Sequence, residues 1–205
     1  MYFHKTPFWL RALYPSFTWR KPAATKTIYL TFDDGPIPGV TDWVLAQLAH
    51  YQVGATFFCV GDNIRKHPGV FENILAANHS VGNHTFHHLN GWKTETRLYL
   101  ENVQLCQPYL PAQTRLFRPP YGRITRKQAA AVQESGSQIV MWDVLTGDFD
   151  PNLPPDTCLR KSIRATGNGS VVVFHDSLKA QPNLIYALPK YIGHFLKQGF
   201  AFGKL

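Results

Sequence analysis

Short apolar runs alternate with helical segments along almost the whole chain, and this alternation restricts the fold more than any other feature. The runs are rich in β-branched and aromatic residues, as strands buried on both faces are. We expect them at 28–30, 55–60, 80–81, 116–117, 138–142, 170–174 and 200–202. Strands that alternate with helices pair in parallel, so the pattern predicts a parallel sheet covered by helices and closed, or nearly closed, into a barrel.

The segments between these runs have helical spacing. In 41–53 the apolar residues Val44, Leu45 and Leu48 share one face, and Thr41 is a plausible N-cap. Further helices are expected at 68–78, 94–110, 125–136, 155–165 and 183–198, the last interrupted by Pro189. The 205 residues contain no break in composition, which indicates one domain with a sizeable core.

Two adjacent carboxylates, Asp33 and Asp34, end the first strand in the stretch TFDDGP. Parallel α/β folds keep their active sites at the carboxyl ends of strands. Side chains alternate along a strand, so neighbouring aspartates cannot serve one purpose equivalently. One is available to bind a metal while the other stays free as a base. The alternative is a surface Asp-Asp-Gly turn without chemistry.

Other polar residues follow later strands in the same way. They are His84, Arg118, Asp148 and His175. A barrel gathers its strand ends onto one face, so residues that are far apart in the chain are expected to meet there.

His84 and His88 are four residues apart, and on a helical turn this spacing puts two imidazoles on one face. A carboxylate from the Asp33–Asp34 pair would complete a two-His-one-carboxylate metal site with open positions, which is typical of a catalytic centre. A polar histidine cluster on a loop is the alternative. His87 is expected to point away from the metal.

Several motifs together resemble the polysaccharide deacetylases with a NodB homology domain, carbohydrate esterase family 4. They are TFDDGP, the His84–His88 segment HTFHH, Arg118–Gly122 (RPPYG), ATFF at 55–58 and VVFHD at 172–176. The resemblance covers about residues 27–202. It implies a distorted (β/α) barrel of about seven parallel strands, and metal-dependent removal of acetyl groups from N-acetylglucosamine units in a glycan of the peptidoglycan or chitin type.

The resemblance also implies roles for individual residues. Asp34, His84 and His88 would bind one divalent metal, zinc before cobalt, nickel or manganese. Asp33 would be the base, paired with Arg118. The Tyr121 backbone N–H would belong to the oxyanion site, and His175 would be the general acid. Pro119, Tyr121 and Trp142 are expected to contact the substrate.

The sequence departs from the family at its fourth motif, where Asp-x-x-Asp-Trp is common. Here Leu145 stands at the first Asp and Phe149 at the Trp, while Asp148 keeps its place. Asp148 is therefore expected to orient His175, with Asp143 and Asp150 as alternatives.

Residues 1–25 are basic and aromatic and precede the catalytic domain, 26–205. We expect this arm to pack on the barrel, with contact to a membrane surface as the alternative. The net charge of +8 comes from scattered residues, which disfavours nucleic-acid binding. Cys59, Cys106 and Cys158 lack metal-site spacing and are expected to be buried thiols.

No apolar stretch is long enough to cross a membrane, and no signal peptide is recognisable. We expect a protein that is cytoplasmic by default, or in the cell envelope if it is exported by another route. A monomer is expected. Two other functions stay open: a hydrolase of a small non-sugar amide, and a barrel that binds glycan without turnover.

Overall fold

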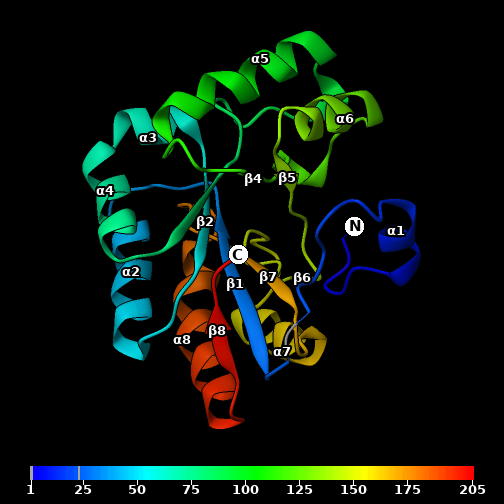
Figure 1. The fold of residues 1–205 in the computed structure, drawn as a ribbon. Coiled ribbons are helices and arrows are strands. Elements are labelled where there is room, and N and C mark those ends of the chain that lie inside the picture. Colours follow the sequence, from blue (N-terminus) through cyan, green and yellow to red (C-terminus); the bar gives the residue numbers. More distant parts are fainter. Residues whose placement is uncertain (1, 23) are drawn as a thin grey trace.

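The computed structural model describes residues 2–22 and 24–205, and a parallel sheet lies at its centre. The strands run in the order β5-β4-β3-β2-β1-β7-β6, and β8 pairs with β1. They are β1 (Thr27–Asp33), β2 (Thr56–Cys59), β3 (Ser80–Asn83), β4 (Leu116–Phe117), β5 (Gln138–Ile139), β6 (Val144–Leu145), β7 (Val171–His175) and β8 (Ala201–Gly203). The strands β1, β2 and β7, in which all residues but Thr27 and His175 are buried, form the middle of the sheet (Figure 1).

The sheet curls into a half-barrel because residues 138–145 cross from one edge to the other. The Val140 N–H donates to the Phe117 carbonyl on the β4 side, and the Asp143 N–H donates to the Val171 carbonyl on the β7 side. The expected strand at 138–142 is shorter, since β5 ends at Ile139, and the sequence pattern missed β6. The expected distorted (β/α) barrel is confirmed in this form.

Helices cover the outside of the sheet, except α1, which lies apart from it (Figure 1). They are α1 (Phe8–Leu13), α2 (Val40–Tyr51), α3 (Gly61–Lys66), α4 (Pro68–Ala76), α5 (Thr96–Cys106), α6 (Arg126–Glu134), α7 (Pro155–Ala165) and α8 (Gln181–Lys197). The prediction for α7 is correct to the residue, while α1 and α3 were missed because each has only six residues. No helix in the described part of the chain is both long enough and apolar enough to span a bilayer.

Two local expectations are wrong. Thr41 is not an N-cap, because α2 begins at Val40 and the Thr41 hydroxyl instead donates to Asp176. Pro189 does not interrupt α8, which is one continuous helix. Burial of a long apolar face of α8 against the sheet outweighs the hydrogen bond that the proline cannot make.

The described part of the N-terminal arm lies along the stretch that closes the barrel. Lys5 and Thr18 form isolated bridges with Val144 and Val140. Phe17 and Trp19 are buried in a second apolar cluster beside β4, β5 and α6. The three cysteines are buried and unpaired.

Candidate active site

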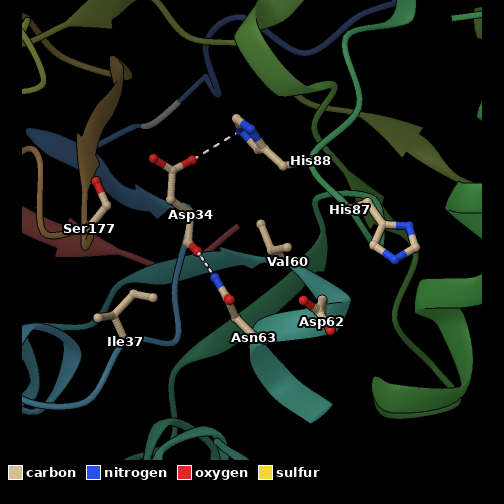
Figure 2. Close-up of a pocket in the computed structure, with 8 residues that line it drawn as sticks. All are labelled: Asp34, Ile37, Val60, Asp62, Asn63, His87, His88 and Ser177. Atoms are coloured by element: carbon tan, nitrogen blue, oxygen red, sulfur yellow. Dashed lines mark hydrogen bonds and ion pairs between the residues drawn. The ribbon is translucent and has the colours of Figure 1, made fainter. Parts of the chain in front are cut away.

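The two aspartates at the end of β1 have different surroundings. Asp33 is the last residue of the strand and lies in register with Phe58 of β2 and His175 of β7. Asp34 has a φ of 85°, so the chain leaves the strand in a left-handed conformation and turns the second carboxylate away. Asn63 of α3 holds this turn by donating to the Asp34 carbonyl (Figure 2).

Asp34, His84 and His88 form a group whose ligand atoms all lie within 4.8 Å of one another. The His88 Nε2 is 3.1 Å from Asp34 Oδ1, and the His84 Nε2 is 3.8 Å from the same oxygen. Figure 2 shows Asp34 and His88 pointing toward each other. Two imidazoles and one carboxylate are the donor set that zinc and similar ions accept.

The two histidines do not share a helical turn, so that part of the expectation is wrong. Residues 84–88 form a loop after β3, with φ values of 61° at Thr85 and 55° at His88. This loop brings the imidazole rings to 5.0 Å between centroids.

The neighbours of the buried His84 fix its tautomer and its charge. Its Nδ1 lies 2.7 Å from the Arg118 carbonyl, which can only accept, so Nδ1 carries the proton and the lone pair of Nε2 faces Asp34. Burial lowers the pKa of His84 to about 4, which keeps the imidazole neutral near pH 7. For Asp34, burial opposes ionisation, but the hydrogen bond to His88 and the nearby His175 and His84 hold its pKa below the ordinary value.

His87 lies apart from this group. Its Nδ1 is 2.8 Å from the Asn102 side-chain nitrogen of α5, and Figure 2 shows its ring pointing away from Asp34.

Arg118 is fully buried and connects Asp33 to the barrel wall. Its Nη1 donates to Asp33 Oδ1 at 2.6 Å and to the Thr31 hydroxyl at 2.8 Å. Its other nitrogens donate to the Val140 and Met141 carbonyls. Because every contact is directional, the guanidinium fixes the position of the Asp33 carboxylate.

The residues after Arg118 form a turn beside the Asp34–His84–His88 group. Pro119 is buried, while Tyr121 has a φ of 60°, is 61% exposed and places its ring 4.6 Å from that of His88. Trp142 packs beneath this turn, since a Cβ on Gly122 would meet its ring at 2.6 Å.

His175 is paired with Asp148 at two points. The His175 Nδ1 is 2.7 Å from Asp148 Oδ1, and the His175 backbone N–H donates to Oδ2 at the same distance. Burial alone would lower the pKa of His175, but the Asp148 carboxylate, with smaller effects of Asp34 and Asp33, raises it to about 9.

The two alternative carboxylates contact the arm instead. Asp143 binds Lys5 at 2.6 Å, and Asp150 accepts a hydrogen bond from Tyr2.

Sequence reasoning gave no role to Asp176, which supports the turn after Asp34. Its carboxylate accepts hydrogen bonds from the Gly35 N–H and the Thr41 hydroxyl, and so connects the end of β7 to the turn after Asp34. The only indication of its importance in the sequence was its place in the VVFHD motif. Asn63 lies in none of the motifs.

A cavity of about 350 Å³ opens beside Asp34 and His88 (Figure 2). Its lining combines the ligands with apolar and polar side chains: Asp34, Ile37, Val60, Asp62, Asn63, His87, His88 and Ser177. Its size and mixed lining suit part of a polar ligand that reaches Asp34 and His88 from this side.

The family model for polysaccharide deacetylases matches residues 20–140. A peptidoglycan-N-acetylglucosamine deacetylase of Bacillus cereus is 30% identical over 90% of this chain and 89% of its own. The chain belongs to the polysaccharide deacetylase family. A chitooligosaccharide deacetylase of Azorhizobium caulinodans is 30% identical over 74% of each chain. The chain also matches the peptidoglycan deacetylase PgdA of Listeria monocytogenes, at 33% identity, but spans only 34% of that protein.

Solved structures of the family have the same fold. The Bc1960 peptidoglycan N-acetylglucosamine deacetylase superposes with a TM-score of 0.88, at 30% identity over 98% of this chain and 95% of its own. A mutant of BA3943, a family 4 pseudoenzyme with restored enzymatic activity, superposes with a TM-score of 0.82, at 26% identity over 96% of this chain and 72% of its own. The fold alone therefore does not establish turnover, and the residues at the site must carry that argument.

Proposed function

We propose that this protein is a metal-dependent deacetylase that hydrolyses the N-acetyl group of N-acetylglucosamine units in glycans of the peptidoglycan or chitooligosaccharide type. The proposal rests on one observation: three groups of polar side chains lie together at one end of the barrel. These are the Asp34–His84–His88 group, the Asp33–Arg118 pair and the His175–Asp148 pair.

The donor set fits one divalent ion, zinc before cobalt, nickel or manganese. His84 offers its Nε2 because its Nδ1 is held by a carbonyl, and Asp34 and His88 complete the set. When bound, such an ion acts as a Lewis acid that polarises the acetyl carbonyl and lowers the pKa of water. An ion held by these three side chains would keep positions open for water and substrate.

Asp33 is the proposed base. Arg118 holds its carboxylate in place and balances its charge, so Asp33 accepts the proton of the water that attacks the acetyl carbonyl carbon. The negative charge that develops on the acetyl oxygen is stabilised in part by the Tyr121 backbone N–H. Pro119 and Trp142 shape the pocket for the acetyl methyl group.

His175 is the proposed general acid. Its Nδ1 pairs with Asp148, which leaves Nε2–H to protonate the sugar nitrogen as the carbon–nitrogen bond breaks. The raised pKa keeps the imidazolium charged near pH 7, where it has a proton to give.

The experiment is acetate release from chitooligosaccharides and from peptidoglycan, before and after chelation and with zinc added back. We expect release that chelation abolishes and zinc restores. Thermal unfolding measured in parallel checks that the chelated protein is still folded at the assay temperature, since loss of a bound ion lowers the melting temperature. Acetate release that survives complete metal removal would contradict the proposal.

Two alternatives give different results in the same assay. The first alternative is a barrel that binds glycan without turnover, and BA3943 is a pseudoenzyme with the same fold. Such a protein would bind chitooligosaccharide and metal but release no acetate. A hydrolase of small amides would release acetate from an acetylated non-sugar amine and leave both glycans untouched.

A further inference from the structure

The helix α1 turns its apolar face to the solvent, which is unusual for a helix on a protein surface. Its exposed residues Phe8, Trp9, Ala12 and Leu13 are all apolar, with exposed fractions of 76% for Phe8 and 57% for Leu13. Surface helices ordinarily turn their apolar stripe inward and their charges outward. Figure 1 shows α1 at the edge of the molecule, apart from the sheet.

The inner face of α1 carries the charge. Arg11, the one charged residue of this helix, is directed at the body, where its Nη1 lies 3.8 Å from Asp143. The partly buried Leu10 and Tyr14 pack against the apolar cluster of Phe17 and Trp19. The orientation of α1 is therefore fixed by its inner contacts, and the apolar face is held outward.

Positive charges outnumber negative ones beside α1. The buried Asp143 has Lys5 at 2.6 Å, Arg20 at 3.5 Å and Arg11 at 3.8 Å, so one negative charge faces three positive ones. These three side chains keep between 31% and 40% exposure. The first acidic residue of the chain is Asp33, so the arm itself supplies no negative charge.

We propose that the outer face of α1 inserts into the surface of an anionic lipid bilayer and attaches the protein there. Exposed apolar side chains that include a Trp suit the boundary between headgroups and acyl chains, and neighbouring cations attract anionic headgroups. A second copy of this chain fits less well, because it would bring two cation-rich surfaces together. One short helix gives reversible attachment that salt weakens.

This inference does not depend on the proposed function, because binding is scored without activity. The full chain is mixed with vesicles of phosphatidylglycerol and phosphatidylcholine, or of phosphatidylcholine alone, and bound protein is measured by flotation. We expect binding to the anionic vesicles at low salt, much less at high salt, and little to the neutral vesicles.

Paired variants locate the contact. Phe8→Ser with Trp9→Ser is expected to lower the partition coefficient by about tenfold or more, since two apolar side chains lose their insertion. Leu98→Ser with Leu105→Ser, which changes two exposed leucines of α5, is the matched control and is expected to bind as the wild type does. The single change Trp9→Phe should keep binding but remove part of the blue shift of tryptophan emission on vesicles.

Three results would overturn the proposal. They are equal binding of the wild type and the Phe8/Trp9 variant, absence of binding to anionic vesicles at low salt, and a dimer in light scattering that the Phe8/Trp9 variant converts to a monomer. The last result would mean that a second copy covers the face. We expect the melting temperature of the variant to be unchanged, because α1 contains no buried residue. This measurement shows that the variant is folded.

Discussion

Asp33 and Asp34 are neighbours in the chain, yet each has a separate set of partners. Asp33 stays in the strand and is bound by a buried guanidinium, whereas Asp34 leaves the strand and faces two imidazoles. The alternation of side chains along a strand predicts that they differ. The left-handed φ at Asp34 increases the separation, and this could not be predicted because non-glycine residues rarely adopt it.

Asp33→Asn separates the base from the metal site. The amide cannot take a proton, so we expect acetate release to fall on the order of 10²–10⁴-fold. Zinc content should stay stoichiometric, because Asp34, His84 and His88 are unchanged. The variant is also expected to lose about 3–5 kcal/mol of stability, since the buried Arg118 charge loses its partner, and melting curves must accompany the assay. Full activity in Asp33→Asn would rule out this residue as the base.

The His175–Asp148 pair predicts the alkaline limit of activity. His175 must be protonated to act as the acid, so activity is lost as pH rises through about 9. In Asp148→Asn the charge that raises the pKa is gone, and the alkaline limb of the pH–rate profile should move toward 6.5, the ordinary value. An alkaline limb that does not move would mean that another group is the acid.

The same pair has a consequence for stability, with a defined sign. The folded pKa of His175 lies above its unfolded value, so the pairing stabilises the fold fully below pH 6.5. That contribution decreases above pH 6.5 and is lost as the pH passes about 9. We expect the difference in melting temperature between the wild type and Asp148→Asn to be larger at pH 6 than at pH 10.

At the scale of elements, the end of β1 depends on a glycine. A Cβ on Gly35 would overlap the Asp176 carboxylate, which joins β7 and α2 to this turn. Gly35→Ala is therefore expected to shift Asp34 and to weaken zinc binding by about 10–100-fold, as loss of outer-shell support does. Gly69→Ala in α4 is the control, because a Cβ there meets nothing within 4 Å. Equal zinc affinity in the two variants would contradict this role of the turn.

Sequence periodicity found the elements that carry the site, because buried strands and amphipathic helices leave strong patterns. It also predicted that His84, Arg118, Asp148 and His175 follow strands, which is how they reach one end of the barrel. It could not predict the loop that joins His84 to His88, since left-handed backbone at Thr85 and His88 is imposed by tertiary contacts. It missed β6 because a strand of two residues is too short to leave a periodic pattern.

At the scale of the whole molecule, the arm and the barrel share a core. Phe17 and Trp19 of the arm are buried in a cluster with Phe117 and Ile139 of the sheet. The arm also runs beside the 138–145 stretch that closes the half-barrel. The same stretch supplies the Val140 and Met141 carbonyls that hold Arg118, so the arm contacts the segment that positions this residue.

Asp143 is the residue on which that attachment is centred, and its removal gives the last prediction. Asp143→Asn deprives Lys5, Arg11 and Arg20 of their shared counter-charge, and three uncompensated cations would then repel one another at a partly buried site. We expect trypsin to cleave faster after these three residues, together with a lower melting temperature. Zinc affinity should hold, because Asp143 contacts none of the metal ligands. Cleavage of the arm at the wild-type rate would contradict this prediction. It would show that the buried aromatic residues are sufficient to hold the arm on the barrel.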